Sequence, residues 1–88
     1  MNTMNRALTV PQLSARWSMS YQYATGGYPM RLSLHSDQTG AQLGHSIIVM
    51  SLSDFQLRQA DIRRLSEDYA QQGYAIYGTE GRPLVAKQ

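Results

Sequence analysis

The sequence predicts an α+β domain in which one helix packs on one face of a small mixed four-stranded sheet, in the order β-β-β-α-β. Three observations predict it: a pair of alternating apolar and polar stretches, a β-branched run, and one long amphipathic stretch. A chain of 88 residues holds one domain at most. We place this domain at residues 8–79, with residues 1–7 and 80–88 as loosely ordered tails.

The first two strands are expected to form a β-hairpin around two adjacent glycines. Apolar side chains alternate with polar ones on both sides of these glycines, at Trp17, Met19, Tyr21, Tyr23, Met30, Leu32 and Leu34. A two-residue turn at Gly26-Gly27 would place Tyr23 opposite Met30 and Arg16 opposite Asp37. The other face of the hairpin would stay open and carry Arg16, Ser18, Ser20, Gln22, Arg31, Ser33 and His35.

Residues 43–50 predict a third strand, antiparallel to the second, because they are rich in β-branched side chains. The helix is expected over residues 54–72, with Ser53 and Gln56 as a capping box. One side of this helix is apolar, at Phe55, Ile62, Leu65 and Tyr69. Oppositely charged pairs stand four residues apart at Asp54/Arg58, Arg63/Glu67 and Arg64/Asp68. Gly73 would end the helix, and residues 74–77 would form a fourth strand beside the first, giving the order 3-2-1-4.

The start of the chain also offers an alternative. The segments Leu8-Thr9-Val10 and Leu13-Ser14 resemble the opening of excisionase-type helix-turn-helix domains. That resemblance implies a recognition helix after Ser20. The chain has its two glycines in that place, and they would break a helix, so the hairpin is the favoured interpretation.

Composition excludes several classes of protein. With 42% hydrophobic and 16% charged residues, the chain is expected to fold rather than to stay disordered. The absence of cysteine excludes disulfide scaffolds, thiolate metal sites and thiol nucleophiles. The first residues lack the apolar segment of a secretory signal, and the run Ile47-Ile48-Val49-Met50 is far shorter than the roughly 20 residues that span a bilayer. We therefore expect a cytoplasmic protein with no membrane association.

No catalytic motif stands out. The glycines form neither a dinucleotide-binding nor a Walker motif, and Gly-x-Ser-x-Gly is absent. His35 is expected to be solvated on the open face, and His45 to be partly buried. A ribonuclease would have to combine His35 and Asp37 with Arg16 and Arg31, but their spacing is not specific for that chemistry. We expect no enzymatic activity, no cofactor and no metal.

Binding of another macromolecule is the remaining interpretation. Residues 1–36 have a net charge of +3, residues 37–80 of −3 and residues 81–88 of +2, which is less basic than the surfaces that neutralise phosphates. We expect a small regulator, inhibitor or accessory factor, of the kind that mobile elements encode, with a protein partner. The residues expected to contact that partner are Arg16, Gln22, Tyr28, Arg31 and His35. The alternative is a nucleic-acid-binding regulator that uses the arginine-bearing sheet face and the N-terminal segment, and a homodimer through an edge strand is also compatible with the sequence.

Overall fold

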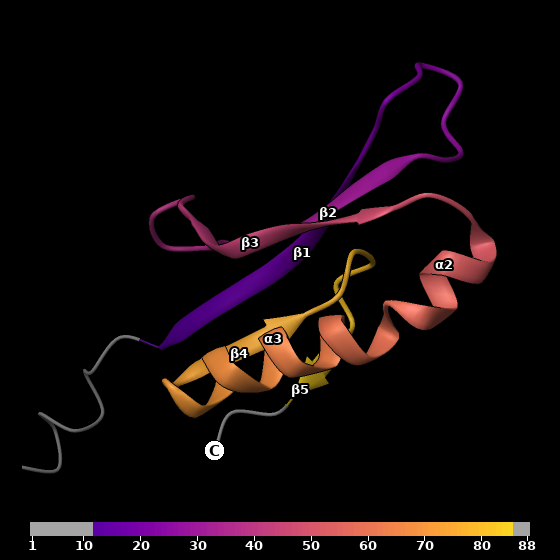
Figure 1. Cartoon of the computed structure of the whole chain (residues 1–88). Helices are drawn as coiled ribbons and strands as arrows, with labels where there is room; N and C mark the ends of the chain where they lie inside the picture. The colour runs from indigo at the N-terminus through magenta and orange to yellow at the C-terminus, as the bar shows by residue number, and fades with distance from the viewer. Residues whose placement is uncertain (1–11, 86–88) are drawn as a thin grey trace, which may run out of the picture.

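The computed structural model describes residues 12–85, in which five strands form one sheet and two helical segments pack on one of its faces (Figure 1). The elements are β1 (Leu13–Tyr21), β2 (Met30–Ser36), β3 (Gln42–Val49), α2 (Leu52–Leu57), α3 (Gln59–Gln71), β4 (Tyr74–Tyr77) and β5 (Pro83–Val85). The strand order is β3-β2-β1-β4-β5, with β1 antiparallel to β2 and parallel to β4. The predicted α+β class and the predicted order of the first four strands are confirmed.

β5 adds a strand that the sequence did not predict. It pairs antiparallel with β4, although it falls within residues 80–88, which were expected to form a loose tail. The predicted N-terminal tail, residues 1–7, lies outside the described residues.

The β1–β2 hairpin has a register two residues away from the predicted one. Tyr21 lies opposite Met30, and the Gln22 amide donates to the Pro29 carbonyl oxygen at 3.2 Å. The two glycines have φ angles of +85° and +80°, but they lie inside a loop of residues 22–29. The predicted two-residue turn is therefore wrong. A shift of two residues keeps every side chain on the same face of the sheet, so the alternation alone could not fix the register.

The hydrophobic core lies between the sheet and α3. Its buried apolar side chains are Ala15, Trp17, Met30, Leu32, Leu34, Ile47, Val49, Ala70 and Ile76. The predicted apolar side of the helix, Phe55, Ile62, Leu65 and Tyr69, packs half-buried against them. The indole Nε1 of Trp17 donates to Ser66 Oγ at 2.9 Å, so a buried hydrogen bond joins β1 to α3.

The helical region begins earlier than predicted because a different serine caps it. Ser51 Oγ accepts a hydrogen bond from the Asp54 amide at 3.0 Å, and the Asp54 carboxylate accepts one from the Met50 amide at 2.8 Å. The first bond satisfies an amide that the first turn leaves without a helical partner, and the second joins the residue before the cap to the helix. The helix therefore starts at Leu52, and Ser53 lies inside it instead of capping it.

The helical region is also divided at Arg58, which separates α2 from α3. The Arg58 guanidinium lies 3.3 Å from the Asp54 carboxylate and 3.5 Å from the Asp61 carboxylate, and the first of these contacts confirms a predicted pair. The other two predicted pairs, Arg63/Glu67 and Arg64/Asp68, form no ion pair in the described part of the chain. α3 ends at Gln71 and is followed by Gly73 at a φ of +103°, as the sequence predicted.

β3 is irregular, and a glycine makes the irregularity possible. The pairing between β2 and β3 shifts register between Leu32 and Leu34. Gly44 lies opposite this shift with a φ of +73°, a conformation that residues with a Cβ rarely adopt. A Cβ at Gly44 would lie 2.8 Å from Leu65 Cδ1. Glycine therefore permits both the bulge and the close approach of α3 to β3.

Candidate functional site

The five residues predicted to bind a partner do not form one site. Gln22 and Arg31 line a hollow of about 340 Å³ at the loop end of the sheet. Arg16 lies opposite His35 near the other end of β1, on the same face. Tyr28 is half-buried and packs against the core, so it is not free at the hairpin tip as expected. The open face thus holds the other four residues in two separate places.

Arg16 is held by an acidic neighbour. Its Nε lies 2.7 Å from Asp37 Oδ1 and its Nη2 lies 3.1 Å from Asp37 Oδ2, while Ser14 Oγ donates to the same carboxylate at 2.7 Å. The hydrogen bonds from Arg16 and Ser14 lower the pKa of Asp37, and the same carboxylate raises the pKa of Arg16. The guanidinium also lies over the Tyr77 ring, 5.5 Å from its centroid. The predicted contact with Asp37 is confirmed, although the residue directly opposite Arg16 is His35.

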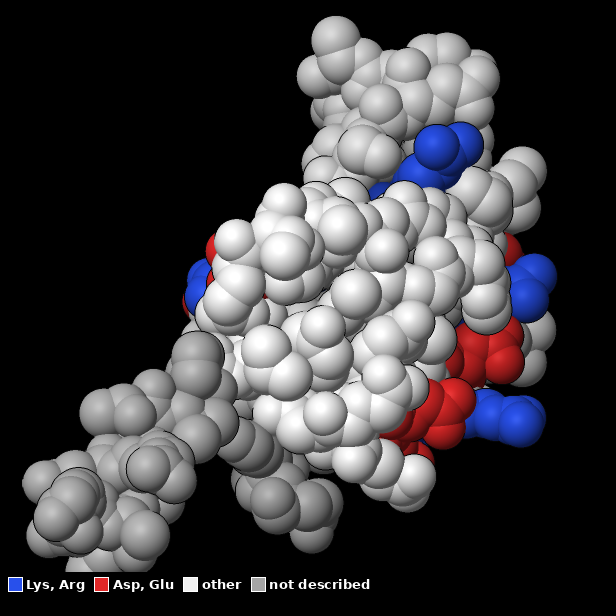
Figure 2. All heavy atoms as spheres, turned by 90° about the vertical axis from the view of Figure 1, so that its left-hand side faces the viewer, with Lys and Arg blue, Asp and Glu red and all other residues white. Residues whose placement is uncertain are grey.

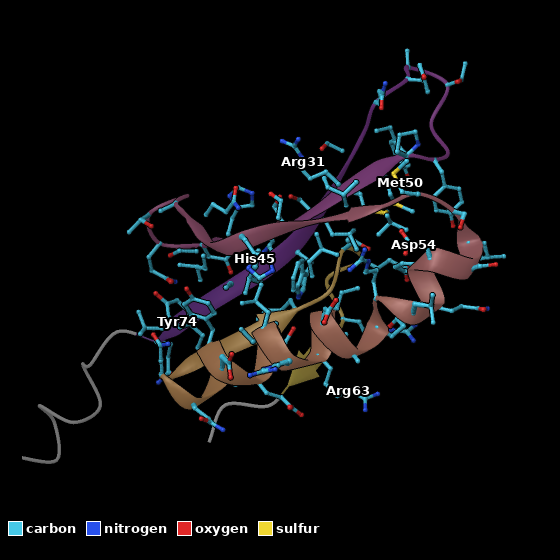
Figure 3. The ribbon with its side chains drawn as sticks, in the orientation of Figure 1. Arg31, His45, Met50, Asp54, Arg63 and Tyr74 are labelled. Atoms are coloured by element: carbon cyan, nitrogen blue, oxygen red, sulfur yellow. The ribbon has the colours of Figure 1, made fainter. Side chains whose placement is uncertain are left out.

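Short polar side chains are linked by hydrogen bonds in the middle of the open face. Ser33 Oγ lies 2.8 Å from Ser46 Oγ, which also accepts from Gln42 Nε2 at 3.2 Å. Ser33 is buried, although it was expected to be part of the open surface. The Arg31 side chain forms no hydrogen bond or ion pair within residues 12–85, and it points away from the helices (Figure 3). Arg31 is therefore available to a partner on this face.

The two histidines have no shared chemistry. His35 is half-buried, with Nδ1 3.3 Å from a backbone carbonyl oxygen. His45 is exposed, not partly buried as predicted, and it lies in the part of β3 where the pairing with β2 shifts register. It lies between β3 and α3, in a hollow of about 360 Å³ that Asp61 and Asp68 also line (Figure 3). No group of three or more His, Cys, Asp or Glu side chains in residues 12–85 is placed to hold a metal ion.

The helices leave one end of the sheet uncovered. Three side chains predicted to lie under the helix are exposed, namely Met19, Tyr21 and Tyr23. Met50, on the connection from β3 to α2, and Leu52, the first residue of α2, are 61% and 60% exposed. Met30 lies between β1 and β3 in this region of the sheet and is buried. We call Met19, Tyr21, Met50 and Leu52 the apolar end.

An apolar groove opens beside the apolar end. Its first hollow, of about 190 Å³, lies between β1, the helices and the turn from β4 to β5. Met19, Phe55 and Leu84 are among its lining residues, and none of the lining residues is charged. An adjoining hollow of about 210 Å³ shares Leu84 with the first and reaches Arg63 on α3. We call the two hollows together the apolar groove.

Charged side chains do not gather into a basic surface on the face shown in Figure 2. Basic and acidic side chains lie along its margins, and its centre carries no charge. In the described part of the chain, no helix combines the length and the apolar character needed to cross a bilayer.

Comparison of the chain with protein-family models, with curated proteins and with solved structures finds no match. The functional interpretation therefore depends on the geometry of the chain itself.

Proposed function

We propose that this protein is a non-enzymatic binding protein that regulates, inhibits or assists another protein by contacting it through the apolar end. The carrying observation is the exposure of Met19, Tyr21, Met50 and Leu52 near the end of the sheet where Met30 pairs with Tyr21 and Val49. Large apolar side chains that lie together on the surface of a small domain are typical of interaction sites. Aromatic residues, Met and Arg are also enriched in protein interfaces.

Polar residues near the loop end of the sheet support the same function. Gln22 and Arg31 line the hollow at that end together with Tyr21 and Ile48. A partner that contacts the end of the sheet from both sides would reach the apolar end and the Arg31 guanidinium together. Such an interface would have an apolar centre and a polar rim, which is the usual arrangement.

A protein partner is favoured over a nucleic acid. Sheet-face proteins that bind single strands stack bases on exposed aromatic rings and neutralise phosphates with free cations. Here Trp17 is buried, and the charge of Arg16 is balanced by Asp37. On the described open face, Arg31 is the one arginine that forms no ion pair. One such cation gives little affinity for phosphates.

The test is co-purification from the native host with and without nuclease, using the tagged full chain. The first variant carries Met50→Glu and Leu52→Glu, two exposed positions at which a charge should not affect folding. The second carries Arg16→Ala and Arg31→Ala on the open face. We expect the wild-type chain to capture a partner protein in a stoichiometric amount that nuclease does not remove. The first variant should lose this partner, and the second should retain it at least in part.

Two results would contradict the proposal. Enriched DNA or RNA that disappears with nuclease and is lost with the arginine variant would favour a nucleic-acid-binding regulator. A protein partner that the Met50→Glu/Leu52→Glu variant captures as well as the wild type would show that the apolar end is not the interface.

A further inference from the structure

β1 has an unpaired edge along its second half. β4 pairs with β1 from Leu13 to Arg16 and ends at Tyr77. Beyond Arg16, no strand of residues 12–85 pairs with that side of β1. The β1–β2 hairpin therefore extends past the end of β4, as Figure 1 shows.

Backbone groups on this edge point outward. The Asp37 amide donates to the Ser14 carbonyl oxygen, and the Gln22 amide donates to the Pro29 carbonyl oxygen, so even-numbered residues of β1 bond to β2. Odd-numbered residues direct their amide and carbonyl groups to the other side. At Met19 that side has no partner strand within residues 12–85. An extended segment of another chain could bond there.

The other edges of the sheet are protected against strand addition, and this one is not. β3 is interrupted by the bulge at Gly44, while β5 has three residues and begins with Pro83. Bulges, short strands and proline are the usual ways in which proteins block an edge. Residues 17–21 of β1 read Trp-Ser-Met-Ser-Tyr, with no charge and no proline.

From this edge we infer the form that the partner takes: an extended segment that pairs with β1 at Met19 and inserts an apolar side chain into the apolar groove. The inference rests on the proposed function, and it names the mode of binding. Main-chain hydrogen bonds would give affinity, and alternate side chains of the segment would give specificity. Since Met19 lines the first hollow, every second side chain of an added strand would face that hollow.

The groove sets the chemistry of the segment. A volume of about 190 Å³ is smaller than typical small-molecule sites, which are roughly 300–1,000 Å³, and suits one large apolar side chain. The first hollow has no charged lining residue, so a charged side chain there would be desolvated without a partner. Arg63, which lines the adjoining hollow, forms no ion pair within residues 12–85. The segment should therefore combine an apolar anchor with an acidic residue toward Arg63.

The test selects displayed random decapeptides on the full chain and measures their affinity for three variants. Met19→Pro deletes the outward amide without removing a β1–β2 bond. Arg63→Glu reverses the charge at the end of the groove, and Arg64→Glu, which reverses the neighbouring exposed charge on α3 outside the groove, is the matched control. We expect the selected peptides to have alternating apolar residues and an acidic residue. Their affinity for the first two variants should be about tenfold weaker than for the wild type, and their affinity for the control should be unchanged.

A second measurement leaves the protein unchanged, so it stands even if Met19→Pro fails to fold. A selected peptide is made with N-methyl groups on alternate amides, in each of the two frames. Strand addition predicts that one frame abolishes binding and the other preserves it, since only alternate amides bond to β1. Equal effects of the two frames, or no selected peptides, would overturn the inference.

The failure of this inference can be separated from the failure of the proposed function. If the host partner is lost with Met50→Glu/Leu52→Glu but is captured normally by a folded Met19→Pro variant, protein binding stands and strand addition is overturned. If the wild type dimerises in solution and Met19→Pro abolishes the dimer, the occupant of the edge is a second copy, and a partner segment is overturned.

Discussion

The indole nitrogen of Trp17 donates a 2.9 Å hydrogen bond to the hydroxyl of Ser66, and both residues are buried. The same hydroxyl donates to the Ile62 carbonyl oxygen at 2.7 Å. This pair joins the centre of β1 to the middle of α3 at the point where the helix crosses the sheet. β1 extends past this crossing to the exposed Met19 and Tyr21, which places the apolar end outside the cover of the helices.

Ser66→Ala should destabilise the fold, although alanine favours helices. The change leaves the buried indole N–H without an acceptor, which costs about 1–3 kcal/mol. Chemical denaturation of Ser66→Ala, Trp17→Phe and the double variant measures this cost. We expect the double variant to lose less stability than the sum of the two single variants. Additive losses would show that the hydrogen bond contributes nothing.

Gly44→Ala and Gly40→Ala separate backbone conformation from packing. Both glycines have positive φ, but a Cβ at Gly40 meets nothing within 4 Å, whereas one at Gly44 would lie 2.8 Å from Leu65 Cδ1. Each substitution should cost about 1–3 kcal/mol for the conformation. Gly44→Ala should cost more because Leu65 must also move. Equal losses in the free energy of unfolding would mean that α3 does not approach β3 as closely as described.

Ser51→Ala and Ser53→Ala test where the helical region begins. Ser51 Oγ caps α2 through the Asp54 amide, so its removal should cost about 1 kcal/mol. Ser53 is exposed inside α2, and Ser53→Ala should change stability by less than about 0.5 kcal/mol. Thermal denaturation of the two variants compares them directly. A larger loss from Ser53→Ala would restore the cap that the sequence predicted.

Asp37 should make stability fall in acid. Its hydrogen bonds to Arg16 and Ser14 hold its pKa below the ordinary value of 3.8, so the folded state binds the proton less well than the unfolded state. The stabilisation is present above pH 3.8 and is lost as the pH falls from that value through the lower pKa of the folded state. Unfolding experiments between neutral pH and acid should show a steeper acid loss for the wild type than for Asp37→Asn. Identical pH profiles would contradict this account.

Much of the fold could be predicted because the alternation and the helical periodicity depend on which side chains are buried. The parallel pairing of β4 with β1 followed from the handedness of the crossover and is confirmed. The hairpin register could not be predicted, because a shift of two residues preserves every face. The cap at Ser51 was missed because Ser53 offered a more familiar spacing, although Asp54 stands three residues after Ser51.

The candidate site was harder to predict than the fold. The sequence pointed to the open polar face, but there Arg16 is held by Asp37 and Tyr28 is not available. The apolar end was missed because alternation predicts which face of a strand is apolar, but not how far the helix covers it. One signal was present: the apolar residues of the hairpin extended to Tyr23, further than one helix could cover.

Amide hydrogen exchange of the free protein, resolved by NMR along β1, tests the open edge most directly. The account predicts that the amides of Ser18 and Ser20, which face β2, are protected, and that the Met19 amide between them exchanges rapidly. Protection of Met19 equal to that of both serines would contradict the account, because the edge proposed to receive a partner would already be occupied.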